Sequence, residues 1–181
     1  MLNVPNILTL LRLLLIPVIT YVALGAAGIS WLAAPVFGIA ALTDWLDGIA
    51  ARKLNQVTEF GKIFDPVVDR IFIASVLLIL YIKISSHVPL WAILIVIGRD
   101  LVMVLGWVYI ANLGKRIRVT YEGKLATAVL MLSAFILLIN VGQTFGWITK
   151  IGVLLFYVGV ALSLKSGLNY LKVGIAAIRH T

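Results

Sequence analysis

The chain of 181 residues contains no cysteine, which excludes both a disulfide framework and a thiolate metal site. Charged residues are also scarce: they make up 12% of the chain, and only seven of them are acidic. A soluble globular domain carries about 25% charged residues. This shortage of charge predicts a protein whose surface is largely in contact with lipid.

Apolar residues are abundant instead, at 62% of the chain with a mean hydropathy of +1.12. Six apolar runs each approach the ~20 residues that a bilayer crossing needs. They cover residues 8–28, 32–52, 61–82, 89–111, 122–141 and 149–172. We therefore predict an all-α integral membrane protein with six transmembrane helices and a short N-terminal interfacial segment over residues 1–7. The length fits a single membrane domain over residues 1–181.

Positive charge is in excess, with a formal net charge of +8. Because these residues lie at the ends of apolar runs and form no stripe, we expect membrane lipids and phosphate-bearing substrates as partners and no nucleic acid. They also favour one side of the membrane, which by the positive-inside bias places both termini and the link between the second and third runs in the cytoplasm. That side holds Arg52, Lys53, Lys62, Lys115, Arg116, Arg118, Lys124, Lys172 and Arg179, and the other side holds Lys83 and Lys150.

Four aspartates interrupt this apolar pattern at the ends of the second and third runs, where carboxylates are costly. If both runs are helices, two of the aspartates are spaced i,i+3 and the other two i,i+4, so that each pair shares a helix face. Two small residues and one arginine fall on the same arc as the first pair, which spans roughly 140° at about 100° per residue. The residues are Asp44, Asp47, Gly48, Ala51 and Arg52 on the second run and Asp65 and Asp69 on the third.

Four carboxylates that converge near a membrane repel one another unless a cation neutralises them. A hard divalent ion such as Mg²⁺ or Mn²⁺ is the usual partner of an all-oxygen cluster, so the spacing indicates a metal site. The alternative is a set of helix-end charges that snorkel to the interface. Their partners would then be Arg52, Lys53, Lys62 and Arg70.

The spacing of these residues, Asp-x2-Asp-Gly-x2-Ala-Arg-x8-Gly-x3-Asp-x3-Asp, resembles the signature of the CDP-alcohol phosphatidyltransferases. All eight fixed positions are matched, by Asp44, Asp47, Gly48, Ala51, Arg52, Gly61, Asp65 and Asp69. The resemblance implies an enzyme of the bacterial cell membrane that transfers a phosphatidyl group from CDP-diacylglycerol to a glycerol-type acceptor and releases CMP. It also implies a homodimer and an active site that faces the cytoplasm.

The resemblance also implies residue roles. Asp44, Asp47, Asp65 and Asp69 would hold two Mg²⁺ or Mn²⁺ ions, and Asp69 would also accept the proton of the attacking hydroxyl. CDP-diacylglycerol would be bound by Gly48, Ala51, Arg52, Gly61 and Thr9, and the acceptor by Arg99, Arg116, Arg118 and Lys124. No serine or histidine stands beside the motif as a nucleophile, which favours direct displacement over a covalent intermediate.

Two polar features outside the motif have open interpretations. Asn6, Thr9 and Arg12 recur every third residue and either face the same cavity or serve as helix caps and a snorkelling arginine. Arg99 and Asp100 interrupt the fourth run, and because adjacent helical residues point about 100° apart we do not expect them to pair with each other. One of them either reaches the aspartate hairpin or forms a structural ion pair between helices, for example with Arg70.

The acceptor is the harder question. The chain is most similar to the branch of the family that makes phosphatidylglycerophosphate or cardiolipin. Members that use glycerol-3-phosphate resemble one another in an arginine eight residues after the fourth-run arginine and in a Gly-Lys-x-Lys-Thr run, where this chain has Trp107 and Ala126. Since two cationic contacts for a phosphomonoester are missing, we expect phosphatidylglycerol as the acceptor, as in cardiolipin synthases, with glycerol-3-phosphate as the alternative.

A protein of another class, a small transporter or channel with an acidic pore site, is the remaining alternative. Such transporters usually contain inverted repeats or broken helices near the midplane of the membrane. This sequence shows neither, and its acidic cluster lies toward one face. The enzyme is therefore the favoured interpretation.

Overall fold

The computed structural model describes residues 4–25, 30–54, 59–112, 121–140 and 146–179, with side chains for residues 9–25, 30–43, 67–106, 121–140 and 146–172. Within these ranges the chain forms six α-helices and one 3₁₀ turn, and no strand. Each predicted apolar run corresponds to one of the helices. Their bounds are α1 Val4–Leu24, α2 Ala33–Leu54, α3 Glu59–Ile84, α4 Leu90–Asn112, α5 Tyr121–Ile139 and α6 Gly146–Arg179, with the turn η1 at Ser30–Leu32.

The expected interfacial segment over residues 1–7 is not a separate element where it is described, because residues 4–7 belong to α1. Pro5 lies in the first turn of this helix, where the backbone N–H that proline lacks has no helical partner. The helix therefore begins before the proline and the apolar run, and an interfacial location of these residues stays a prediction.

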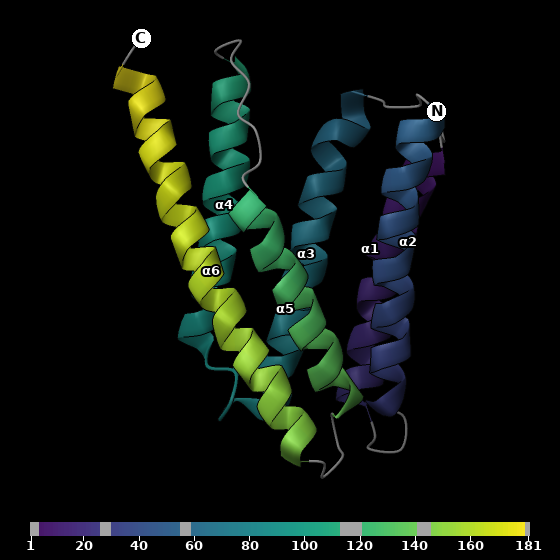
Figure 1. Cartoon of the computed structure of the whole chain (residues 1–181). Coiled ribbons are helices and arrows are strands. Elements are labelled where there is room, and N and C mark those ends of the chain that lie inside the picture. The colour runs from purple at the N-terminus through teal and green to yellow at the C-terminus, as the bar shows by residue number, and fades with distance from the viewer. Residues whose placement is uncertain (1–3, 26–29, 55–58, 113–120, 141–145, 180–181) are drawn as a thin grey trace.

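The six helices run up and down in one bundle (Figure 1). α5 packs along α6, α4 also packs on α6, and α1 packs against both α2 and α3. The end of α2 and the beginnings of α1 and α3 lie at one end of the bundle with the C-terminal end of α6, and the α3–α4 turn lies at the other end (Figure 1). The two helices that carry the aspartates therefore meet α1 at the end of the bundle where the chain begins.

Apolar side chains fill the interior and also cover the outside. Phe37 of α2 and Phe72 of α3 are buried and stack with ring centroids 5.6 Å apart. Leu105, Leu154 and Trp147 each expose about two thirds of their surface. Large exposed apolar areas mark a surface that meets another apolar phase.

Among the residues whose side chains the structure describes, two helical stretches are long and apolar enough to cross a membrane, Tyr121–Ile139 and Gly146–Lys172. Thr9–Leu24 and Ser30–Thr43 are apolar but shorter. The charged motif and the buried ions on α3 and α4 lower the hydropathy of those helices, so the count of six spans stays a prediction. The 34 residues of α6 amount to about 51 Å at 1.5 Å per residue, more than the ~30 Å of a bilayer core.

Candidate active site

The backbone places the aspartate motif where the sequence expects it. Asp44 and Asp47 lie in the second half of α2, and Asp65 and Asp69 lie in the first half of α3. Of the four, only the side chain of Asp69 falls within the described residues. The side chains of Asp44, Asp47, Gly48, Ala51, Arg52, Gly61 and Asp65 lie outside them. Convergence of the four carboxylates thus stays a prediction, and the described side chains by themselves contain no group of three or more metal-ligating residues.

Asp69 forms an ion pair with Arg12, which joins α3 to α1. The Arg12 side chain is 3% exposed and that of Asp69 is 35% exposed. Thr9, one helical turn before Arg12, is 1% exposed. Because Arg12 is buried and pairs with Asp69, the snorkelling arginine is wrong, and the interpretation in which Arg12 faces the aspartate hairpin is confirmed. Thr9 lies inside α1 and not at its cap, and its orientation toward the aspartates stays a prediction. The side chain of Asn6 lies outside the described residues.

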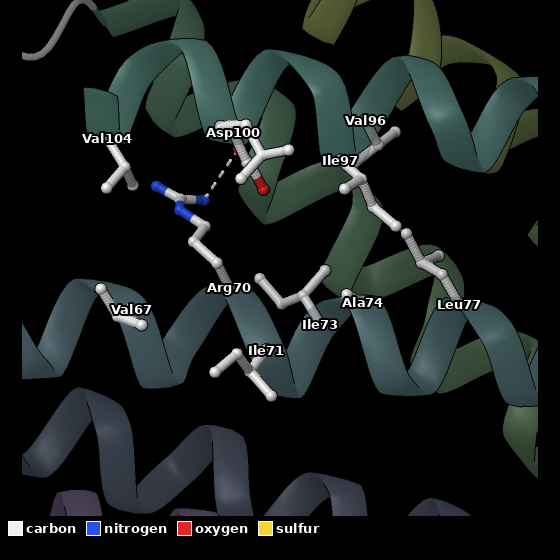
Figure 2. A pocket seen from close by; sticks show the side chains of 11 residues that line it. Val67, Arg70, Ile71, Ile73, Ala74, Leu77, Val96, Ile97, Asp100 and Val104 are labelled. Carbon is white, nitrogen blue, oxygen red and sulfur yellow. Dashed lines mark ion pairs between the residues drawn. The ribbon is translucent and has the colours of Figure 1, made fainter. Parts of the chain in front are cut away.

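A second ion-pair cluster lies beside the first. Oδ1 of Asp100 on α4 forms an ion pair with Arg70 of α3 at 3.3 Å and accepts a hydrogen bond from Arg99 at 2.6 Å. The expectation that Arg99 and Asp100 do not pair is wrong, since the long arginine side chain folds back along its own helix to the carboxylate. The ion pair between Asp100 and Arg70 is confirmed, and Figure 2 shows it bridging α3 and α4.

Arg99 is held from two further helices. Its Nη2 donates to the carbonyl of Gly123 at 2.9 Å and its Nη1 lies 3.4 Å from the hydroxyl of Thr127, both on α5. On α6, a Cβ at Gly167 would lie 3.3 Å from Cγ of Arg99, so only a very small residue fits there. With 5% of its surface exposed, Arg99 connects α4, α5 and α6.

Of the other residues predicted to bind the acceptor together with Arg99, only Lys124 has a described side chain, and it is not buried as Arg99 is. Lys124 is exposed on α5, one residue beyond the carbonyl that Arg99 contacts. Arg116 and Arg118 lie outside the described residues. The assignment of these residues to the acceptor stays a prediction.

Two cavities flank Arg70. The inner cavity, of about 90 Å³, lies among α1, α2, α3 and α5. The outer cavity, of about 190 Å³, lies between α3 and α4 and is apolar except for Arg70 and Asp100 (Figure 2). The inner cavity is lined by Arg12, Ala40, Asp69, Arg70, Phe72, Ile73, Thr127 and Met131.

Sequence reasoning did not assign Arg70 or Thr127 to the site. Arg70 directly follows the last aspartate of the motif, and Thr127 is spaced i,i+4 from Gly123, whose carbonyl accepts its hydroxyl at 3.1 Å. Arg70 Nη1 also lies 3.5 Å from the Thr127 hydroxyl. The position of Arg70 next to Asp69 was a signal in the sequence that could have assigned it to the site. Its contact with Thr127 depends on packing between α3 and α5, which the sequence does not show.

Comparison of the chain with known proteins identifies its family. The family model described as CDP-alcohol phosphatidyltransferase matches residues 2–164. The chain belongs to the CDP-alcohol phosphatidyltransferase family, and it is therefore an enzyme of this family and not the transporter or channel considered above.

Curated bacterial relatives are similar over nearly the whole chain. Those of Shigella flexneri serotype 5b and Escherichia coli K12 are each 34% identical over 179 aligned residues, and that of Salmonella choleraesuis is 35% identical over 177. Each alignment covers 94% of this chain and 93% of the relative. All three are named CDP-diacylglycerol--glycerol-3-phosphate 3-phosphatidyltransferase.

These names overturn the expectation of phosphatidylglycerol as the acceptor. That expectation was based on the absence of cations at Trp107 and Ala126, and relatives that are similar over 94% of the chain are named for glycerol-3-phosphate instead. The absence of cations at two positions did not exclude a phosphomonoester acceptor, because other cationic side chains of a protein can form the charge-assisted contacts to a phosphate. The cardiolipin synthase interpretation is wrong.

Proposed function

We propose that this protein transfers the phosphatidyl group of CDP-diacylglycerol to a hydroxyl of glycerol-3-phosphate and releases CMP. The similarity of the chain to relatives named for this reaction carries the proposal. The inward-facing ion pair of Arg12 and Asp69 supports it, because it places a carboxylate inside the bundle beside a cavity.

In the proposed reaction the acceptor oxygen forms a bond to the lipid phosphorus as the bond from that phosphorus to the bridging oxygen breaks. CMP leaves with the bridging oxygen, and the hydroxyl proton passes to a carboxylate oxygen of Asp69. Arg12 donates to Oδ1 of Asp69 and thereby fixes the orientation of the carboxylate, while the 35% exposure leaves it open to an acceptor. Direct displacement needs no other nucleophile from the chain.

The donor set suits a hard divalent ion, because the motif supplies only carboxylate oxygens and Asp69 shows one of them directed into the bundle. Mg²⁺ or Mn²⁺ held by Asp44, Asp47, Asp65 and Asp69 would neutralise the diphosphate charge and stabilise the departing CMP. Gly48, Ala51, Gly61, Arg52 and Thr9 would bind the nucleotide lipid. Arg99, Arg116, Arg118 and Lys124 would bind or surround the acceptor.

We further propose six membrane spans, a homodimer and an active site that faces the cytoplasm. Exposed apolar side chains on every helix whose side chains are described support a membrane location, for example Leu14, Ile39, Leu78, Leu105, Leu132 and Leu154. Arg52 and Lys53 near the end of α2, Lys62 near the beginning of α3 and Arg179 at the end of α6 belong to helix ends on the side of the bundle with the aspartates, which supports the orientation.

The test is release of CMP from CDP-diacylglycerol by the purified full-length protein in detergent. We expect release with glycerol-3-phosphate in the presence of Mg²⁺ or Mn²⁺ and none after chelation, and much slower release with phosphatidylglycerol. Product mass identifies phosphatidylglycerophosphate. Efficient use of phosphatidylglycerol with no use of glycerol-3-phosphate would disprove the proposed acceptor, and full activity in excess chelator would disprove the metal requirement.

A further inference from the structure

The described ion pairs of the bundle leave a surplus positive charge. Three arginines, Arg12, Arg70 and Arg99, face two aspartates, Asp69 and Asp100. Arg12 pairs with Asp69, and Arg99 holds Asp100 at the shorter distance of 2.6 Å. Arg70 shares that Oδ1 atom at 3.3 Å, so Arg70 carries the charge that is least neutralised among these contacts. A cation inside an apolar bundle favours the binding of an anion.

Arg70 also has the position from which to bind one. Its side chain is 27% exposed, against 3% for Arg12 and for Arg99, and it lines both the inner and the outer cavity. Its contact with the Thr127 hydroxyl at 3.5 Å is long, so the Arg70 guanidinium has remaining capacity to donate hydrogen bonds, whereas the Thr127 hydroxyl already donates to the carbonyl of Gly123. In Figure 2 the guanidinium extends from α3 toward Asp100, between apolar side chains of the two helices.

The inner cavity has the size of a small anionic group. A single water needs roughly 10–15 Å³ of such space, so about 90 Å³ has room for a phosphate and part of its substituent but not for a nucleotide. Its polar lining consists of Arg12, Arg70, Thr127 and the one carboxylate of Asp69. The rest of the lining is apolar, and a charge-assisted hydrogen bond is stronger beside apolar side chains than in bulk water.

We infer that Arg70 forms the phosphate subsite for the acceptor, in the cavity that it lines together with Asp69 and Thr127. The inference rests on the proposed function, since it assigns the phosphomonoester of glycerol-3-phosphate to this subsite. In that acceptor a three-carbon chain separates the attacking hydroxyl from the phosphate, and Asp69 and Arg70 are consecutive residues that line one cavity. A general base and a phosphate-binding residue at adjacent positions therefore suit an acceptor in which a three-carbon chain separates the hydroxyl from the phosphate.

The inference also explains the acceptor that the relatives' names indicate. The chain lacks cations at Trp107 and Ala126, but Arg70 adds one from α3, and Arg12 lines the opposite side of the same cavity. Asp100 then acts as a positioning residue, because it holds Arg70 toward α4 and α5 without itself lining the inner cavity.

The experiment compares wild type with Arg70→Gln in the full-length protein, using glycerol-3-phosphate and glycerol as acceptors. We expect Arg70→Gln to lower the ratio of kcat/KM for glycerol-3-phosphate to kcat/KM for glycerol by about 10- to 100-fold, mainly through KM for glycerol-3-phosphate. Arg70→Lys should recover part of this loss. Lys83→Gln, which removes one exposed positive charge from the other end of α3, is the matched control and should leave the ratio unchanged.

A binding measurement separates the subsite from the reaction. Glycerol-3-phosphate and inorganic phosphate should each raise the Tm of the wild-type protein without CDP-diacylglycerol, and Arg70→Gln should lose both shifts. An unchanged acceptor ratio with retained Tm shifts overturns the inference. A raised KM for CDP-diacylglycerol with an unchanged ratio assigns Arg70 to the diphosphate instead and also overturns it. Wild type that shows the phosphate shift but transfers nothing to glycerol-3-phosphate disproves the proposed function alone.

Discussion

At the scale of single residues, the pairing of Arg12 with Asp69 means that a substitution of the proposed base lowers stability as well as activity. The two effects can be measured separately. A buried arginine without its carboxylate loses a strong charge-assisted contact, so a variant at Asp69 affects stability as well as chemistry. Asparagine retains the shape and one acceptor oxygen but does not take up a proton. The two effects therefore separate when stability is measured beside turnover.

We predict that Asp69→Asn lowers kcat by at least about 100-fold, as expected for loss of a general base, while binding of CDP-diacylglycerol weakens much less. Single-turnover CMP release and equilibrium binding of the nucleotide lipid measure the two quantities. The Tm in detergent verifies that the variant is folded.

Arg52→Ala is the complementary variant, since an arginine that contacts the diphosphate supports binding more than proton transfer. It should raise KM for CDP-diacylglycerol with a smaller effect on kcat. If Asp69→Asn binds CDP-diacylglycerol poorly but has a normal kcat at saturating nucleotide lipid, then Asp69 contributes to binding and is not the general base.

The sequence was sufficient to find Asp69 because a fixed spacing within one helix determines which residues share a face. It offered the ion pair of Arg70 with Asp100 only as one of two alternatives, and it was insufficient for the contact of Arg70 with Thr127, which comes from another helix. It also gave the wrong result for Arg99, because helical spacing describes where Cβ points and not where a long flexible side chain ends. Contacts between helices depend on packing that no local pattern encodes.

At the scale of elements, the bundle depends on close contact between α5 and α6. A Cβ at Gly159 would lie 2.7 Å from Cγ of the buried Leu130, and one at Gly152 would lie 2.7 Å from Leu137. The hydroxyl of Ser133 donates to the carbonyl of Gly152 at 2.8 Å. Small residues and interhelical hydrogen bonds of this kind hold membrane helices together, since lipid provides no hydrophobic driving force between them.

We predict that Gly159→Ala lowers stability, because the added methyl displaces Leu130 from a packed interface at a typical cost of about 1–3 kcal/mol. Alanine also favours a helix by about 1 kcal/mol over glycine, so the net loss should fall in the lower part of that range. The Tm of the purified protein in one detergent measures it.

Gly98→Ala is the control, because a Cβ there meets no described atom within 4 Å. It should leave the Tm equal or slightly raised. Equal melting of both variants would mean that α5 and α6 do not pack as closely as the structure has them.

The positions of the helices were predictable because hydropathy is a local property, and six apolar runs became six helices in the described chain. The residue at which α1 begins and the length of α6 could not be predicted from hydropathy. Pro5 permits a helix start that the apolar run does not mark, and the last turns of α6 continue from the end of the run at Lys172 to Arg179. Which helices pack together also required the structure.

At the scale of the whole molecule, charge and architecture indicate the same orientation. The ends of α2 and α6 and the beginnings of α1 and α3 share one end of the bundle, and the α3–α4 turn lies at the other end (Figure 1). Within the described helices, Arg52, Lys53, Lys62 and Arg179 belong to the first end. Retention of positive charge in the cytoplasm would then place the aspartate motif where CTP-derived substrates and Mg²⁺ are available.

The chain has no cysteine, so single introduced thiols report this orientation without background. We predict that a thiol introduced by Asn55→Cys, between α2 and α3, reacts with a membrane-impermeant maleimide only after the cytoplasmic side is opened. Ser86→Cys lies in the exposed α3–α4 turn and should react in intact cells. Labelling of both variants in detergent shows that each thiol is accessible, and retained CMP release shows that each protein is folded. The reverse labelling pattern would place the aspartates outside the cell, away from the nucleotide lipid's metabolic supply, and would contradict the proposed cytoplasmic active site.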